Sequence, residues 1–271
     1  MLKCIMSLIL CVVTSSAISA EEKMVALWST DGKFYFFGVN SGTIYFGPYE
    51  SAYDYSEGYA PVHDKSAGGW VYQDETGVRL KLGPYLQAYP FKQGIAPVQR
   101  EDGWFYINKK GDLLSGPYKL ALPFYEHCAL ILKNGSSNYS LVDLNFDILL
   151  DGLDISPLIA HGGVGDGGIW TVKKDGMWRF WHPSSGFLAG NIEADSVSPN
   201  RFGIARFGTG GERFGYISTV TGEILKDGPL GLSNHMGSWY ASQKTNGKWE
   251  VVVATEDYRF GDFSRIGPLD G

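Results

Sequence analysis

The sequence predicts an all-β protein built from about seven similar antiparallel meanders, each of roughly 36 residues. Three observations support this fold class. First, 36 glycines and 39 aromatic residues occur among 271 residues, of which only 19% are charged. Such a composition is typical of short strands joined by tight turns, and it argues against a disordered chain or a helical bundle. Second, an aromatic residue recurs at an even spacing, and third, glycine turns recur beside it.

The first twenty residues differ from the rest of the chain. They combine a positive charge at Lys3, an apolar run from Ile5 to Val13 and a group of small residues at 15–20. This order is typical of a secretory signal peptide, and the apolar run is too short to span a bilayer. We therefore expect a signal peptide at residues 1–20, a single β domain at residues 21–271, and a periplasmic or secreted location.

Charge and cysteine content narrow the classes of partner. The formal net charge is −6, which makes nucleic acid and anionic lipid poor candidates. No later stretch has the length of a membrane span, so we expect the mature chain to be soluble. Cleavage of the signal leaves Cys128 as the one cysteine and excludes an intrachain disulfide. Lipoprotein processing at Cys11 stays open as an alternative.

The recurring aromatic residue, here called the anchor, defines the repeat. Its spacings along the chain are 36, 34, 35, 39, 36 and 35 residues. Such an even period indicates a repeat architecture, in which one meander buries its faces against the next. The anchors are Phe34, Trp70, Trp104, Tyr139, Trp178, Phe214 and Trp249.

Two sets of turns flank the anchors. Asp-Gly or Asn-Gly precedes the anchor at residues 31–32, 102–103, 134–135, 175–176 and 246–247. A second glycine follows it at Gly42, Gly77, Gly111, Gly186 and Gly222. These dipeptides supply the positive φ angles of tight hairpins, so each anchor is expected to begin the middle strand of a meander.

A Gly-Pro-Tyr corner closes the early units at residues 47–49, 83–85 and 116–118. Proline fixes φ and has no N–H to donate, which suits a sheet edge or a corner. The aromatic residues of the corner segment are expected to pack against the neighbouring unit, because a meander of this size cannot bury its own faces.

Residues 91–107 resemble the WG-repeat family. The match runs Phe91-Lys-Gln-Gly94-Ile-Ala96-Pro-Val98 and then Gly103-Trp104-Phe-Tyr-Ile107. The resemblance covers most of residues 24–271 and is specific over 47–126. It implies an all-β repeat protein of the kind common in exported bacterial proteins, without catalytic residues.

The fourth and fifth units depart from the WG-repeat pattern. His127 stands at the position of Gly94, Tyr139 replaces tryptophan, and a glycine-rich insert occupies residues 162–168.

For the architecture we favour a closed, β-propeller-like array, because closure removes long exposed edges. The alternative is an open β-hairpin solenoid.

The chain shows no catalytic motif. Its five histidines lie in different repeats, and the glycine-rich insert lacks the Lys-Ser/Thr of a phosphate loop. We expect no enzyme activity, no metal and no cofactor. The candidate binding residues are His161 and Asp166 of the insert and three tryptophans outside the anchor positions, Trp170, Trp181 and Trp239. The alternative for these tryptophans is core packing, and Cys128 is expected to be a buried apolar residue.

The leading functional hypothesis is a non-catalytic exported protein that binds another protein. One specific version is an immunity-type inhibitor that neutralises a toxin in the periplasm. The first alternative is a propeller that binds glycans or, as a weaker option, hydrolyses them. The second alternative is a structural component of the envelope.

Overall fold

The computed structural model describes residues 22–154, 168–188, 190–197, 204–210, 213–229, 239–243, 248–253 and 258–263. All regular structure within these ranges is β-strand in antiparallel sheets, which confirms the all-β prediction. None of the described segments is a helix long and apolar enough to cross a membrane. The expected signal peptide lies outside the described residues. The chain divides into two compact units, unit 1 up to Pro90 and unit 2 from Phe91.

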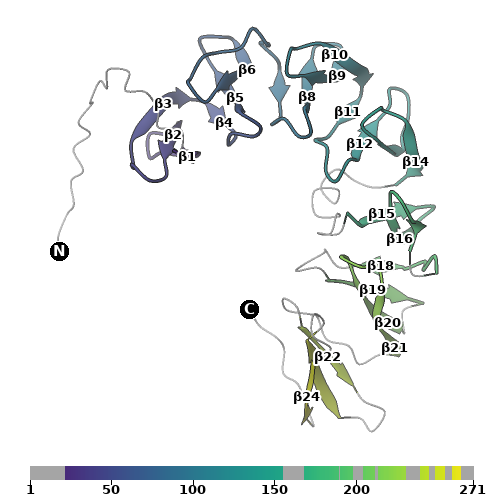
Figure 1. Ribbon diagram of the computed structural model, residues 1–271. Helices are drawn as coiled ribbons and strands as arrows, with labels where there is room; N and C mark the ends of the chain where they lie inside the picture. The colour runs from purple at the N-terminus through teal and green to yellow at the C-terminus, as the bar shows by residue number, and fades with distance from the viewer. Residues whose placement is uncertain are drawn as a thin grey trace, which may run out of the picture. The chain divides into compact units, whose positions relative to one another are not determined.

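Unit 1 contains two three-stranded meanders and one further short strand (Figure 1). The strands are β1 (Met24–Trp28), β2 (Phe34–Gly38), β3 (Ile44–Tyr49), β4 (Ser51–Ala52), β5 (Tyr59–Asp64), β6 (Gly69–Asp74) and β7 (Gln87–Ala88). Strands β1–β3 form one sheet and strands β4–β6 form another, in chain order.

Unit 2 continues the same pattern. Its first strands are β8 (Ile95–Arg100), β9 (Gly103–Asn108), β10 (Leu113–Tyr118), β11 (Leu120–Ala121), β12 (Ala129–Leu132), β13 (Tyr139–Val142) and β14 (Ile148–Leu153). The later strands are β15 (Trp170–Lys174), β16 (Met177–His182), β17 (Gly186–Phe187), β18 (Ser196–Val197), β19 (Ile204–Thr209), β20 (Arg213–Ser218), β21 (Ile224–Pro229), β22 (Trp239–Gln243), β23 (Trp249–Val253) and β24 (Tyr258–Phe263). Strands β11–β17 form one sheet, in which β14 meets β15 at the pair Leu153 and Lys174.

The anchors occupy one register throughout the described chain. Each anchor is the first or second residue of its strand. That strand lies between two others in each sheet except β4–β6, where Trp70 is on the last strand and forms an isolated bridge with Tyr85. Each also pairs, at the Cα level, with a residue of the strand or corner segment that follows. The pairs are Phe34 with Tyr49, Trp70 with Tyr85, Trp104 with Tyr118, Tyr139 with Leu153, Trp178 with Ala194, Phe214 with Gly228, and Trp249 with Phe263. The sequence period is therefore also a structural period.

The glycine before a tryptophan anchor has a steric cause. A Cβ atom on Gly69 would lie 2.6 Å from the carbonyl oxygen of Tyr85, and one on Gly103 would lie 2.8 Å from that of Tyr118. The corner backbone thus approaches the anchor strand so closely that only glycine fits. The predicted turn glycines after the anchor, such as Gly77 with φ of 80°, do adopt positive φ.

A two-residue turn before the Ala-x-Val strand also recurs. Both of its residues have positive φ at Glu57-Gly58, Gln93-Gly94 and Glu126-His127. His127, with φ of 68°, thus adopts the conformation that glycine has in the other two turns. The sequence departure at this position leaves the turn geometry unchanged.

The core is centred on the residue two places after each anchor. This side chain is almost completely buried in Phe36, Tyr72, Tyr106, Leu141, Phe180 and Tyr216. Aromatic residues of the next corner segment pack on it, with ring centroids 4.8 Å apart for Phe36 and Tyr55 and 5.3 Å apart for Tyr106 and Phe124. The expected packing of corner aromatics against the neighbouring meander is confirmed in these pairs.

Candidate functional site

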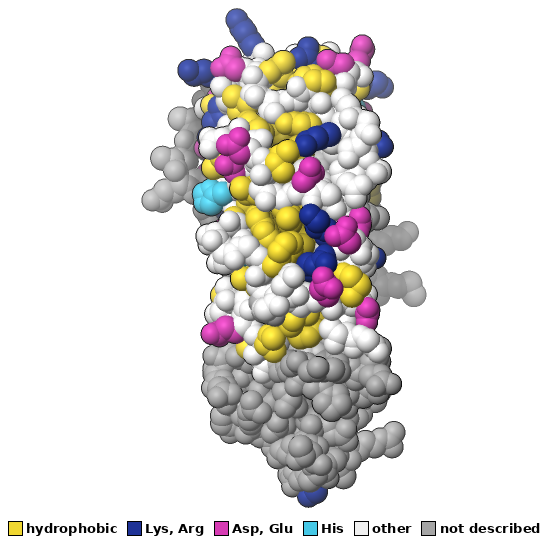
Figure 2. All heavy atoms as spheres, turned by 90° about the vertical axis from the view of Figure 1, so that its right-hand side faces the viewer, with side chains coloured by type: hydrophobic (Ala, Val, Ile, Leu, Met, Phe, Trp, Pro, Cys, Tyr) yellow, Lys and Arg dark blue, Asp and Glu magenta, His cyan; other side chains and the backbone are white. Residues whose placement is uncertain are grey.

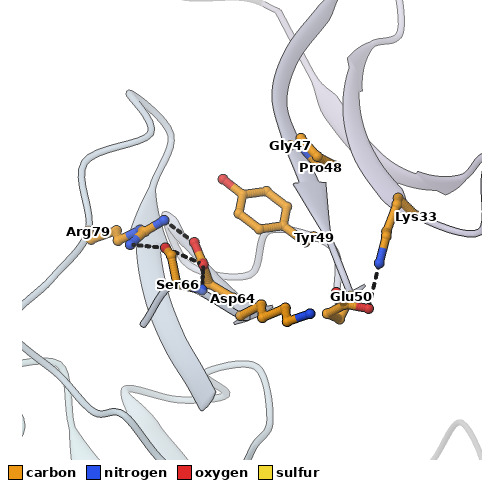
Figure 3. Close-up of a pocket in the computed structure, with 9 residues that line it drawn as sticks. Lys33, Gly47, Pro48, Tyr49, Glu50, Asp64, Ser66 and Arg79 are labelled. Atoms are coloured by element: carbon orange, nitrogen blue, oxygen red, sulfur yellow. Dashed lines mark hydrogen bonds and ion pairs between the residues drawn. The ribbon is translucent and has the colours of Figure 1, made fainter. Parts of the chain in front are cut away.

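A polar pocket of about 400 Å³ lies in unit 1, beside the Gly-Pro-Tyr corner at the end of β3. Figure 3 shows that its side chains come from the first meander on one side and from the β5–β6 hairpin on the other. The lining residues are Lys33, Gly47, Pro48, Tyr49, Glu50, Asp64, Lys65, Ser66 and Arg79. Its volume falls within the range of small-molecule sites, roughly 300 to 1,000 Å³.

The first ion pair of the pocket joins Lys33, which precedes the anchor, to Glu50, which follows the corner tyrosine. The distance from Lys33 Nζ to Glu50 Oε2 is 2.7 Å (Figure 3). The hydrogen bond from Lys33 holds the pKa of Glu50 below its ordinary value, and the positive charges of Lys33 and Lys65 lower it further. Glu50 is therefore ionised at neutral pH.

The second ion pair joins Asp64 at the end of β5 to Arg79 (Figure 3). The Oδ1 atom of Asp64 also accepts hydrogen bonds from the backbone N–H of Ser66 at 2.7 Å and from its hydroxyl at 2.6 Å. Asp64 is buried, so its carboxylate needs these donors to compensate for lost hydration. The Arg79 side chain, in contrast, is 46% exposed.

Tyr49 forms a rigid wall of the pocket. Its hydroxyl donates to Gln73 Oε1, and Gln73 in turn donates to the Tyr55 hydroxyl at 2.8 Å. Burial raises the pKa of Tyr49, while Arg79 and the Gln73 hydrogen bond oppose that shift. Tyr49 is thus a fixed, neutral side chain rather than a titrating one.

The charges of the pocket favour a small anion. The lining holds three cationic side chains and two carboxylates, although the whole chain has a net charge of −6. Lys65 belongs to neither ion pair. Among the described residues, no group of three or more His, Cys, Asp or Glu could hold a metal ion. The pocket therefore has the chemistry of anion binding by lysine and arginine.

The candidates expected from the sequence lie elsewhere. His161 and Asp166 fall outside the described residues, and Trp239 begins β22, where only the backbone is described. Trp170 and Trp181 are buried and face each other across β15 and β16 in one apolar cluster. For these two tryptophans the packing alternative holds, because no exposed ring is left to stack on a ligand.

The lone cysteine is placed as expected. Cys128 is fully buried in the same apolar cluster, and this burial, with a smaller contribution from the charge of Asp143, raises the pKa of its thiol to about 11. A protonated buried thiol is a poor nucleophile, so Cys128 has the properties of a small apolar residue.

Sequence reasoning missed the pocket, although the repeat contains a signal for it. Arg79 pairs with the residue three places after its anchor, and so do Ile44, Leu113 and Ile148 in other meanders. Arg79 is thus charged at a register position where those three meanders have an apolar residue, and the seventh meander also has an arginine there, Arg259 opposite Val252. A comparison of the meanders position by position could have drawn attention to Arg79, together with Arg259.

A second candidate surface follows from that apolar register. Leu113 and Leu114 on β10 are 51% and 40% exposed, and Ile148 and Leu149 on β14 are 47% and 36% exposed. These four residues are here called the β10–β14 apolar edge; β10 is the edge strand of its sheet, whereas β14 lies between β13 and β15 in another sheet. Figure 2 shows exposed hydrophobic side chains gathered between charged ones on one face of the molecule. Adjacent exposed apolar side chains, as in the pairs Leu113–Leu114 and Ile148–Leu149, are candidates for an interaction surface.

Comparison with known proteins assigns no family. No family model and no curated protein matches the chain. Among solved structures, the designed Ika8 protein has a TM-score of 0.42 and 15% identity, covering 85% of this chain and 80% of its own. BamB from Moraxella catarrhalis has a TM-score of 0.44 and 13% identity, with 89% and 82% covered. Sqt1 from Saccharomyces cerevisiae has a TM-score of 0.39 and 12% identity, also with 89% and 82% covered. Similarity at this level assigns no function.

Proposed function

We propose that this chain is a non-catalytic, exported repeat protein that binds another protein through the β10–β14 apolar edge. The observation that carries the proposal is the exposure of Leu113, Leu114, Ile148 and Leu149 on the third strands of two successive meanders. Core packing does not explain these side chains, because the core of each meander is built two residues after the anchor.

The geometry of β10 supports the same proposal. β10 is the edge strand of its sheet, and its register with β9 is irregular at two places. Leu113 and Leu114 are successive residues of that edge strand, and both are exposed. An exposed edge strand with apolar side chains suits a partner that covers the strand.

The test is capture of a partner by the intact protein from an extract of the native exported fraction. We expect the double substitution Leu113→Asp and Leu114→Asp to abolish capture without unfolding the chain. Val220→Asp is the matched control, since Val220 is a 52% exposed apolar residue in a turn of the same unit. Capture that is lost equally in the control, or unchanged in the double variant, would reject the apolar edge as the binding surface.

The immunity version of this proposal has its own test. If the partner is a toxin, co-expression of this protein should protect cells from it, and the Leu113→Asp and Leu114→Asp variant should not. A captured partner without toxicity leaves protein binding intact and removes the immunity role.

We further propose that the meanders close into a β-propeller. The recurrence of one register at every anchor supports this closure, because a uniform repeat lets successive sheets pack at a constant angle. A compact chain of this length has a radius of gyration of about 18 Å. Small-angle X-ray scattering tests this value, and a clearly larger one would favour the open solenoid.

A further inference from the structure

The pocket in unit 1 carries charges that its scaffold does not require. In unit 1 the N–H of Glu50 donates to the carbonyl of His63 at 3.0 Å, and in unit 2 the N–H of Lys119 donates to that of Leu132 at 2.8 Å. Glu50 and Lys119 are therefore equivalent positions. The same corner thus forms around a carboxylate in one place and an ammonium in the other. The backbone of the corner therefore does not determine the charge that it carries.

The buried carboxylate of Asp64 strengthens this inference. A buried ion pair is weak evidence for stability, because desolvation offsets most of the attraction. The equivalent of Arg79 in three other meanders is a leucine or an isoleucine. The second meander therefore keeps a buried carboxylate and its arginine where these three meanders have an apolar side chain, and Arg259 occupies the equivalent position of the seventh meander. Asp64 holds the guanidinium of Arg79 in a fixed orientation at the pocket.

Arg79 retains capacity to bind. Its guanidinium has five N–H donors, of which one engages Asp64 and one contacts the Ser66 hydroxyl at 3.4 Å. Its side chain is 46% exposed at the pocket. A planar guanidinium recognises a carboxylate with two parallel hydrogen bonds, and Lys65 in the same lining adds a second positive charge.

We propose that this pocket binds a small hydroxylated carboxylate of the sugar-acid class, such as a uronic acid. Arg79 and Lys65 bind the carboxylate of the ligand. Glu50, which is ionised and held by Lys33, accepts hydrogen bonds from its hydroxyls. Pro48 and Tyr49 supply the apolar wall against the carbon face of the ring. This site lies in unit 1 and does not depend on the β10–β14 apolar edge.

The experiment is titration calorimetry of the intact protein with galacturonate, a galacturonate trimer, glucose and inorganic phosphate as separate probes. Binding of galacturonate or its trimer, with no binding of glucose, supports the proposal. Tighter binding of the trimer identifies an acidic polysaccharide as the source, and equal binding identifies a free sugar acid. Equal affinity for phosphate, or no binding of either acid at millimolar concentration, would overturn the proposal.

Two variants test the residue roles without breaking the fold. Arg79→Lys keeps a cation beside Asp64 but removes the planar fork, and we expect about a tenfold weaker affinity for galacturonate. Lys65→Ala removes an exposed cation, for which we expect a loss of roughly threefold to tenfold. Lys119→Ala at the equivalent corner of unit 2 is the control. Wild-type affinity in both pocket variants would show that the acid binds elsewhere.

Discussion

In unit 1 the corner tyrosine Tyr49 is followed by Glu50, while in unit 2 the corner tyrosine Tyr118 is followed by Lys119. The backbone of the two corners is the same. Both Gly-Pro bonds are cis, the glycines have φ of 120° and 125°, and both corner tyrosines pair with an anchor. The comparison therefore shows that the repeat requires the backbone geometry and the buried rings. The charge of the residue after the corner tyrosine can vary.

The largest expected effect concerns two buried tyrosine rings, one in each unit. Tyr72 in unit 1 and Tyr106 in unit 2 are fully buried, and their hydroxyls donate to the carbonyls of Tyr89 and Leu122 at 2.7 and 2.8 Å. We expect Tyr72→Ala and Tyr106→Ala each to reduce the free energy of unfolding by about 3 to 5 kcal/mol, because each leaves a large cavity. Urea denaturation measures this loss. A much smaller loss in one unit would show that the two meanders are not equivalent scaffolds.

The next effect concerns the charges that distinguish the two corners. Arg79→Leu leaves the Asp64 carboxylate without its counter-ion and should cost about 1 to 3 kcal/mol, less than a fully buried pair because Arg79 is half exposed. The double variant Asp64→Asn and Arg79→Leu removes the charge and keeps an acceptor for Ser66. We expect the double variant to be more stable than Arg79→Leu alone in the same urea experiment. A double variant as unstable as the single one would mean that unit 1 needs more than charge balance at this position.

A smaller effect is expected at the turn that lacks glycine. His127→Gly should stabilise the protein by about 0.5 to 1 kcal/mol, because glycine adopts the φ of 68° without a steric cost. Loss of the 2.9 Å contact between Gln93 Nε2 and His127 Nδ1 opposes part of this gain. Gln93→Ala, which removes only that contact, is the control for the thermal melting experiment. Destabilisation by His127→Gly beyond that of the control would show that the histidine side chain, not the turn, governs the fourth unit.

The smallest effect is the pH response of the Lys33–Glu50 pair. The pKa of Glu50 is lowered in the folded state, so its contribution to stability is present above its ordinary pKa of 4.5 and is lost as the pH falls through the folded value. Lys33→Ala should move the pKa of Glu50 back towards 4.5, as carbon NMR of the carboxyl group would show. Lys119→Ala should leave the Glu50 titration unchanged. An unchanged Glu50 pKa in Lys33→Ala would show that the ion pair does not form in solution.

Most of the backbone plan could be predicted from the sequence, because it depends on local signals at fixed spacing. Anchors such as Trp104 and turn glycines such as Gly111 determine where a strand begins and turns, and the structure places both as expected. The cause of the glycine before the anchor could not be predicted, since it depends on the carbonyl of Tyr118, about 15 residues further along the chain.

The site was harder to predict than the fold. Lys33 and Arg79 lie in different meanders, and only the folded hairpins bring them to one pocket. Exposed tryptophans could not be distinguished from buried ones by register alone. Trp170 and Trp181 are buried, whereas Trp28, also outside the anchor positions, is 68% exposed. Burial depends on which strands pair, and a single sequence does not specify that for irregular positions.

The buried thiol of Cys128 can report local opening of the apolar cluster in unit 2. With a pKa of about 11, this thiol reacts with an alkylating reagent at neutral pH only while the cluster around it is open. The rate of labelling therefore reports how often Leu130, Leu141 and Leu153 separate in the native state, without any added probe. A partner that binds the β10–β14 apolar edge should slow that rate, because Leu153 of β14 belongs to the same cluster as Cys128.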